Sequence, residues 1–231
     1  MQEAEIGLIG LGVMGSNLAL NIAENGYRIA VWNRTGSKTQ DFAASAGDLT
    51  IVPCETLEEL VASIRRPRPI IIMVQAGAPV DEQIAALRPL LSADDIMIDA
   101  GNANFRDTMR RFRELDGSGL TFIGMGVSGG EEGARHGPSI MVGGAQSSWL
   151  RVRDVLTAIS AKYKDEPCVA WLGSDGAGHF VKMIHNGIEY GLMQAYAEGF
   201  DILKNANIEA LPAEHRFDLD IADIAEVWRR G

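Results

Sequence analysis

Three glycines near the amino terminus restrict what this chain can fold into more than any other feature. Gly10, Gly12 and Gly15 give the spacing Gly-x-Gly-x-x-Gly, directly after an apolar run that has the length of a buried strand. A helical pattern follows over residues 16–24, and residues 27–32 have the composition of a second strand. A strand, a glycine turn, a helix and another strand in this order predict a dinucleotide-binding α/β unit.

Each of these glycines has a role in such a unit. Gly10 permits the tight turn, Gly12 lets the backbone approach a pyrophosphate, and Gly15 lets the helix pack close to the strand. The amino end of the helix then offers unpaired N–H groups and a partial positive charge to the phosphates. Glycines also end strands for purely structural reasons, but the order of the surrounding elements favours the dinucleotide interpretation.

The end of the second expected strand indicates which dinucleotide binds. An Asp or Glu at this place would hold the ribose 2′-hydroxyl of NAD, but the chain has Asn33, Arg34 and Thr35 instead. A guanidinium pairs with a 2′-phosphate through two parallel hydrogen bonds, and the two neighbours can add more. The sequence therefore favours NADP. NAD stays an alternative because the preference depends on Arg34, which could also be an ordinary surface residue.

Strands alternate with helices along most of the chain. Further strands are expected at residues 49–52, 69–74, 95–99, 120–125 and 139–142, and further helices at residues 37–46, 56–63, 80–91, 104–116 and 149–161. The alternation predicts an α/β protein with a Rossmann-like, doubly wound, mostly parallel sheet, followed by the start of an all-helical domain. We place the nucleotide-binding domain at residues 1–175 and the beginning of the helical domain, which is incomplete, at residues 176–231.

Composition excludes several classes of function. The net charge of −10 argues against nucleic-acid binding as a primary role. The two cysteines, Cys54 and Cys168, provide neither a disulfide framework nor metal-ligand spacing, so no metal is expected. No apolar run reaches the length of a membrane span and no signal peptide precedes the first strand, so we expect a soluble cytoplasmic protein.

Two further segments carry polar groups in informative patterns. A glycine-rich stretch over residues 127–138 follows an expected strand, and Ser128 with the N–H groups of Gly129 and Gly130 could form a donor nest for a carboxylate or phosphate. A flexible surface loop is the alternative. The second segment is a long Pro-free helical run around residues 182–190, discussed next.

Four polar residues recur along one face of this helical run, whose other residues are mostly apolar. Lys182, His185, Asn186 and Glu189 fall at i, i+3, i+4 and i+7, so a base, an acid and two hydrogen-bonding groups share one stripe. A solvated stripe is the ordinary meaning of such a pattern. That meaning accounts for the lysine and the glutamate but not for the histidine and asparagine between them, so a catalytic role competes with it.

Several motifs together resemble a known family. They are Gly-Leu-Gly-Val-Met-Gly at 10–15, Asn-Arg-Thr at 33–35, Gly-Asn at 101–102, Val-Ser-Gly-Gly-Glu-Glu-Gly-Ala-Arg at 127–135 and Gly-His-Phe-Val-Lys-Met-Ile-His-Asn-Gly-Ile-Glu-Tyr at 178–190. Over nearly the whole chain they resemble the 6-phosphogluconate dehydrogenase family. The last motif separates this family from hydroxyisobutyrate dehydrogenases, which show Lys-x-x-Asn-Asn on the same helix. The family oxidatively decarboxylates 6-phosphogluconate to ribulose 5-phosphate and CO₂ in the pentose phosphate pathway, and reduces NADP.

The resemblance implies roles for particular residues. Lys182 matches the family's base, which must lose its proton well below the ordinary lysine pKa, and Glu189 matches its acid. The residues implied to contact the phosphorylated sugar acid are Asn102, Ser128, Gly129, Gly130, His185, Asn186 and Tyr190, the last at the phosphate. The residues expected at the cofactor are Gly10, Gly12, Val13, Met14, Gly15, Asn33, Arg34, Thr35, Val74, Gln75, Ala76 and Asn102. Gln75 replaces a lysine often found there. The family needs no metal and forms homodimers.

One departure leaves other functions open. Family members run much further than residue 231, where this chain stops within a helical pattern. The segment beyond would carry a lysine and an arginine that help to hold the substrate phosphate, partly across the dimer. The alternatives are a truncated NADP-binding module with weak or no turnover, and another β-hydroxyacid dehydrogenase with a different acid.

Overall fold

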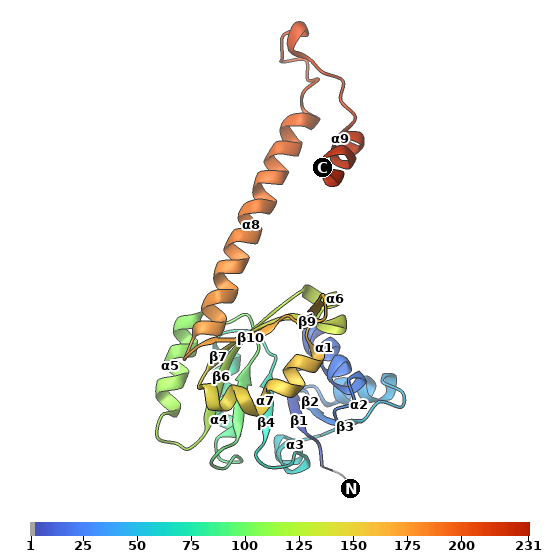
Figure 1. Ribbon diagram of the computed structural model, residues 1–231. Coiled ribbons are helices and arrows are strands. Elements are labelled where there is room, and N and C mark those ends of the chain that lie inside the picture. The colour runs from blue at the N-terminus through green and yellow to red at the C-terminus, as the bar shows by residue number, and fades with distance from the viewer. Residues whose placement is uncertain (1–2) are drawn as a thin grey trace. The chain divides into compact units, whose positions relative to one another are not determined.

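The computed structural model describes residues 3–231 and divides them into two compact units, one reaching residue 183 and the other formed by residues 184–231. An eight-stranded sheet forms the centre of the first unit, with the strand order β10-β7-β6-β5-β4-β1-β2-β3 (Figure 1). The strands are β1 (Ile6–Ile9), β2 (Ile29–Trp32), β3 (Ile51–Pro53), β4 (Pro69–Ile72), β5 (Ile96–Asp99), β6 (Thr121–Ser128), β7 (Ser139–Gly144) and β10 (Val169–Gly173).

The helices of this unit follow the strands in sequence. They are α1 (Val13–Glu24), α2 (Gly36–Ser45), α3 (Leu57–Ser63), α4 (Ala78–Leu87), α5 (Phe105–Leu115), α6 (Gly130–His136) and α7 (Gln146–Ile159), followed by α8 (Ala177–Lys204), which continues into the second unit. Strands β1 to β6 are parallel to one another, whereas β7 runs antiparallel to β6. This arrangement confirms the predicted Rossmann-like, mostly parallel sheet.

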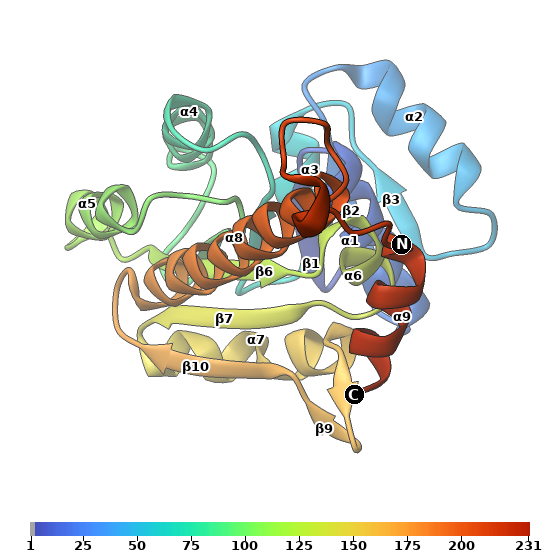
Figure 2. The same cartoon turned by 90° about the horizontal axis from the view of Figure 1, so that it is seen from above.

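Helices lie on both faces of the sheet (Figure 2), and a hydrophobic core lies against each face. One core joins α1 and α7 to the strands through residues such as Leu18, Ile22 and Leu156. The other joins α3, α4 and α5 to the opposite face through residues such as Leu60 and Ile84. Because both faces are covered, the central strands are apolar along their whole length, and β4 carries three consecutive isoleucines with no exposed surface.

The structure differs from the sequence expectation in three places. Helix α1 begins at Val13 rather than at residue 16, because it starts directly after the glycine turn. A short antiparallel pair, β8 (Lys162–Tyr163) and β9 (Glu166–Pro167), and the edge strand β10 were not expected. The glycine-rich stretch forms α6 instead of an open loop, since the buried amide of Asn21 donates to Ala134 O on α6 and to Ile159 O on α7.

The amino end of α8 lies on the sheet with almost no side chains between the two backbones. A Cβ added to Gly178 would collide with the carbonyl oxygen of Gly124 on β6 and would lie 2.5 Å from Met141 O on β7. The next residue, His179, is fully buried in the same contact. The first two turns of α8 therefore belong to the first unit, and their fit depends on glycine.

The second unit contains the rest of α8, a short 3₁₀ turn (Ala213–His215) and α9 (Ile221–Arg230). The Asp220 carboxylate caps α9 by accepting from the N–H groups of Ala222 and Asp223. The rings of Phe200 and Trp228 lie 5.6 Å apart and join α8 to α9. The domain boundary at residue 175 stays a prediction. Over residues 3–231, none of the helices is both long and apolar enough to cross a membrane.

Gly178→Ala tests whether this glycine contact holds α8. We expect the substitution to lower the free energy of unfolding by about 1–3 kcal/mol, because backbone oxygens on two strands cannot move away from the new methyl group. The matched control is Gly199→Ala on the same helix, where a Cβ meets no described atom within 4 Å and where alanine should add up to about 1 kcal/mol. Urea denaturation followed by circular dichroism measures both; equal midpoints for the two variants would contradict the prediction.

Candidate functional site

The glycine turn lies at the carboxyl edge of the sheet, between β1 and β4, where the order of the strands reverses. Gly10 has φ +100°, and a Cβ there would collide with Met73 O, so no other residue fits without strain. A Cβ on Gly15 would collide with Gly10 O, which shows how closely α1 approaches the strand. Gly12 is the N-cap of α1, and the first turn of the helix holds no acidic residue. The turn is therefore shaped for an anionic group.

Asn33 supports the glycine turn from the end of β2. Its Oδ1 accepts from the N–H of Leu11 at 3.0 Å, and its Nδ2 donates to Thr35 O at 3.2 Å. The N–H of Asn33 donates to the Thr39 hydroxyl on α2 at 3.1 Å. Asn33 thus fixes the turn and the start of α2, a structural task that the sequence interpretation did not include.

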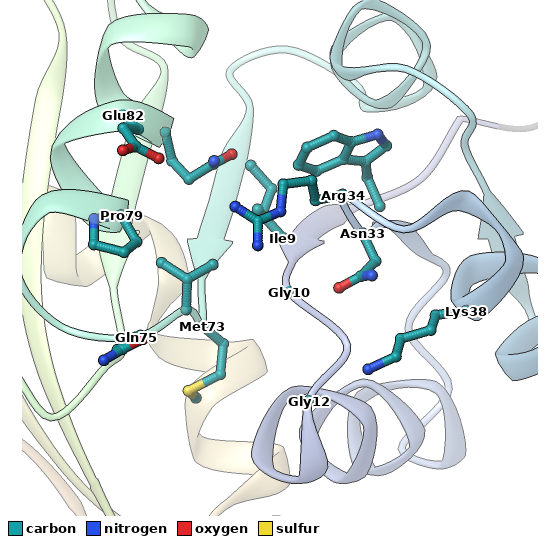
Figure 3. Close-up of a pocket in the computed structure, with 13 residues that line it drawn as sticks. Ile9, Gly10, Gly12, Asn33, Arg34, Lys38, Met73, Gln75, Pro79 and Glu82 are labelled. Carbon is teal, nitrogen blue, oxygen red and sulfur yellow. The ribbon is translucent and has the colours of Figure 1, made fainter.

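An open cleft of about 450 Å³ lies beside the turn (Figure 3). Its walls come from the ends of β1 and β2, the segment after β4, and helices α2 and α4. Its lining residues are Ile9, Gly10, Gly12, Trp32, Asn33, Arg34, Lys38, Met73, Val74, Gln75, Pro79, Glu82 and Gln83. Six of the residues predicted to bind a cofactor line this cleft: Gly10, Gly12, Asn33, Arg34, Val74 and Gln75. Val13, Met14, Gly15, Thr35, Ala76 and Asn102 lie outside its lining.

Two cations reach the cleft from the β2 side. Arg34 follows β2, and Lys38 lies on the first turns of α2; both are exposed, and Figure 3 shows them across the cleft from Pro79 and Glu82. Lys38 is not among the residues predicted from the sequence to bind the cofactor. Its position four residues after Arg34, just inside a helix, is the signal that could have found it. Together the two side chains give the cleft a positive end that suits a phosphate monoester.

The residues predicted for the substrate within the first unit lie on two neighbouring strand ends. Ser128 ends β6 and is half-buried, and Gly129 and Gly130 follow it with φ of +132° and +60° at the start of α6. Asn102 follows β5 in an exposed turn after buried Gly101. The carboxyl ends of β5 and β6 are adjacent, so these groups share one edge of the sheet.

Lys182 stands above β6 on the second turn of α8. A Cβ on Gly126 would lie 2.6 Å from Lys182 Cβ, so the stem of the lysine crosses the strand directly at this glycine. The side chain is half-buried.

His185, Asn186, Glu189 and Tyr190 belong to the second unit. His185 Nδ1 lies 3.3 Å from Asn186 Oδ1 and 3.8 Å from a carboxylate oxygen of Glu189, so three of the predicted groups interact along the helix. The roles of these residues stay predictions, as does the pairing of Lys182 with Glu189 as base and acid.

A buried ion cluster connects the strand ends beneath the site. Arg111 on α5 is 1% exposed and donates to the Asp81 carboxylate, to Asp99 Oδ2 at 3.2 Å and to Gly77 O at 3.0 Å. Asp99 ends β5, and its Oδ1 accepts from Gly101 N. One guanidinium therefore ties the turn before α4 to the turn that carries Asn102.

His179 completes this cluster from α8. It is 1% exposed, and its Nδ1 lies 2.7 Å from the Thr108 hydroxyl on α5. Burial lowers the pKa of His179 below its ordinary value of 6.5, although the Asp99 carboxylate opposes the shift. Burial likewise raises the pKa of Asp99, against the attraction of His179 and Arg111. Among residues 3–231, no group of three or more His, Cys, Asp or Glu side chains is placed to hold a metal ion.

Two family models match the chain. The model for the NAD binding domain of 6-phosphogluconate dehydrogenase matches residues 5–173, and the model for the 6-phosphogluconate dehydrogenase C-terminal domain matches residues 178–210. The two matches meet close to the start of α8.

Curated relatives and a solved structure agree with these models. The decarboxylating 6-phosphogluconate dehydrogenase of Synechococcus elongatus is 54% identical over 231 residues, which are 100% of this chain and 48% of the relative. The NADP(+)-dependent, decarboxylating enzyme of Bacillus subtilis is 48% identical over 231 residues, again 100% of this chain and 48% of the relative. The Plasmodium falciparum 6-phosphogluconate dehydrogenase structure matches with TM-score 0.90 and 37% identity, over 98% of this chain and 48% of that one. The chain spans about half the length of the curated relatives it matches.

The lowered pKa of His179 predicts how stability depends on pH. As the pH falls through 6.5 the unfolded chain takes up a proton on this residue before the folded chain does, so the free energy of unfolding should decrease. The slope from this one group is at most about 1.4 kcal/mol per pH unit and ends below the lowered pKa of the folded state. Urea denaturation between pH 7.5 and 5.5 measures it. His179→Gln should flatten the profile, and an identical slope in this variant would rule out His179 as the source.

Proposed function

Because the chain belongs to the 6-phosphogluconate dehydrogenase family, we propose that it takes part in the oxidative decarboxylation of 6-phosphogluconate to ribulose 5-phosphate and CO₂, with NADP as the oxidant. One observation carries the proposal. The cleft beside the glycine turn ends in Arg34 and Lys38 at the place where an NAD-specific site would hold a carboxylate. The Bacillus relative is named NADP(+)-dependent, and the Plasmodium structure is described with NADP⁺ and with 6-phosphogluconate.

The described residues fit the cofactor. The glycine turn and the uncapped start of α1 suit its pyrophosphate, and the Arg34–Lys38 end of the cleft suits the 2′-phosphate. Val74 and Gln75 line the side of the cleft away from β2. When bound, NADP accepts the hydride that leaves C3 of the sugar acid. Every other step belongs to residues of the chain and the substrate.

Lys182 and Glu189 supply the acid–base chemistry in this proposal. Neutral Lys182 accepts the proton of the C3 hydroxyl as the hydride leaves, which yields a β-keto acid. The C1 carboxylate then departs as CO₂, and its bonding electrons pass to the C3 carbonyl, whose oxygen regains a proton from Lys182. Glu189 then protonates the carbon that has lost CO₂ while Lys182 takes back the proton of the C3 hydroxyl, and the enediol becomes the ketose. Asn102, Ser128, Gly129, Gly130, His185 and Asn186 would hold the carboxylate and hydroxyls, and Tyr190 the phosphate.

A second candidate is a nucleotide-binding module with weak or no turnover. The observation that favours it is that residues 9–83, all in the first unit, suffice to line the cleft. Such a chain would bind NADP without carrying out the reaction. Dehydrogenation of another β-hydroxyacid is a further outcome of the same assay. The homodimer and the cytoplasmic location stay predictions from the family resemblance and the composition.

A turnover assay separates these functions. With 6-phosphogluconate and NADP⁺, we expect absorbance at the NADPH band to grow in proportion to the concentration of the chain and to fall at least about 100-fold in Lys182→Met, which cannot accept a proton. Lys162→Met, an exposed lysine on β8, is the matched control. A wild-type rate no higher than that of Lys182→Met, with NADPH still bound, would support the module. NADPH formation with 3-hydroxyisobutyrate but not with 6-phosphogluconate would indicate a different substrate.

Arg34→Ala tests the preference for NADP. Loss of a charge-assisted pair to the 2′-phosphate should raise the Kd of NADPH about 10- to 100-fold and leave that of NADH within about threefold. Lys38→Ala should act in the same direction. Fluorescence titration measures the affinities, with Arg153→Ala on the outer surface of α7 as the control. Equal losses for both nucleotides would mean that Arg34 does not contact the 2′-phosphate.

A further inference from the structure

Strand β6 receives α8 at two glycines that face the same side of the sheet. A Cβ on Gly124 would lie 2.5 Å from Thr108 Cγ2 and 3.0 Å from His179 Nδ1, and a Cβ on Gly126 would lie 2.6 Å from Lys182 Cβ. The glycines are two residues apart on a strand, and His179 and Lys182 are three residues apart on a helix, so both spacings return to the same face. His179 therefore lies over Gly124 and Lys182 over Gly126 on the same face of β6.

His179 is held from three directions at its end of this contact. Thr108 on α5 contacts Nδ1, Gly124 on β6 lies against the ring, and the Asp99 carboxylate at the end of β5 is close enough to influence its charge. Thr108 in turn donates to Asn104 O at 3.3 Å, at the start of α5. Two of the contacts come from β5 and β6, the strands that lead to Asn102 and Ser128.

We propose that His179 is a positioning residue for the reaction, which acts through α8 by fixing the rotation of its first two turns and thereby setting where the Lys182 amine stands over the β5–β6 edge. The inference rests on the proposed function, because it assigns His179 a purpose only if Lys182 is the base. A rotation of the helix by one residue, about 100°, would carry Lys182 off the strand.

A role in core packing alone would explain the presence of a histidine at position 179 less well. Its Nε2 is buried and has no hydrogen-bond partner within the described part of the chain, and leaving such an atom unsatisfied costs about 1–3 kcal/mol. Leucine or methionine would fill the same space without this cost. What the imidazole adds is a directional contact with the Thr108 hydroxyl, which an aliphatic side chain cannot make. A directional contact fixes rotation, whereas apolar packing alone tolerates small shifts.

Competitive labelling of lysine amines tests the proposal without substrate or cofactor. The folded chain is treated with trace acetic anhydride from pH 7 to 11, and acetylation of each lysine is quantified by peptide mass spectrometry. Thr108→Val removes the hydroxyl at constant shape, and Thr108→Ser retains it. We expect the Lys182 labelling rate at fixed pH to change at least about threefold in Thr108→Val, which corresponds to about half a pKa unit, and to stay near wild type in Thr108→Ser.

Three controls make the result decisive. Lys162 on β8 reports on the reagent and should not change in any variant. Gly126→Ala, which pushes directly on Lys182, shows that the assay detects a displaced lysine. His179→Gln, which changes the ring itself, provides a second test if Thr108→Val does not fold, as judged by circular dichroism. An unchanged Lys182 profile in every folded variant except Gly126→Ala would overturn the proposal, and His179 would then serve stability alone.

This readout separates the two hypotheses. The labelling profile is independent of turnover, so a chain that produces no NADPH can still show a Lys182 that depends on Thr108. If the chain produces NADPH but the labelling rate of Lys182 is unchanged in the Thr108 and His179 variants, the proposed function stands and the positioning role of His179 does not.

Discussion

Direct contact between backbones is the constraint on which the rest of the structure depends. At the start of α1 the Cα of Gly15 lies against the carbonyl of Gly10, and at the start of α8 the Cα of Gly178 lies against that of Gly124. Each contact brings a helix terminus to the carboxyl edge of the sheet at a distance that any side chain would prevent. The first creates the glycine turn beside the cleft, and the second brings Lys182 onto β6. The cleft beside the glycine turn and the proposed base thus both depend on a glycine at which two backbones are in direct contact.

The charge at one end of the cleft is opposite in sign to the net charge of the chain. A net charge of −10 repels an anionic ligand at long range, but physiological salt screens that repulsion beyond about 8 Å. Within this distance Arg34 and Lys38 determine the sign of the field at one end of the cleft, while Glu82 lines the other side. In the proposed function, discrimination between the two nicotinamide dinucleotides would therefore depend on a few contacts at short range, and removing either cation should change it.

The sequence predicted the sheet because its signals are local. Apolar runs between turn residues located β1 to β6, and the glycine spacing identified the tight turn between β1 and α1 without knowledge of any contact. These signals failed where contacts between residues far apart in the sequence determine the local structure. Helix α6 forms in a glycine-rich stretch, where the amide of Asn21, more than 100 residues earlier, donates a hydrogen bond to Ala134 O. Lys38 lines the cleft from α2, and Asn33 accepts from the N–H of Leu11, two contacts between segments that are separate in sequence. Nothing in the sequence distinguishes Arg111 from the other arginines of α5, but in the fold three acceptors surround its guanidinium.

Burying the cluster of Asp99, Arg111 and His179 costs free energy of folding, which indicates that the cluster serves a purpose other than stability. Moving a carboxylate and a guanidinium out of water costs several kcal/mol per ion, and well-packed apolar residues would stabilise the unit at least as well. Burial raises the pKa of Asp99 although His179 and Arg111 act to lower it, which agrees with such a cost. What the ions provide and apolar packing does not is a fixed geometry. Arg111 holds Gly77 and Asp99 at set distances, Asp99 holds Gly101, and His179 meets Thr108 on the same helix as Arg111. The turns after β4 and β5 and the start of α8 are therefore placed by directional bonds to one another, and these three segments carry Gln75, Asn102 and Lys182.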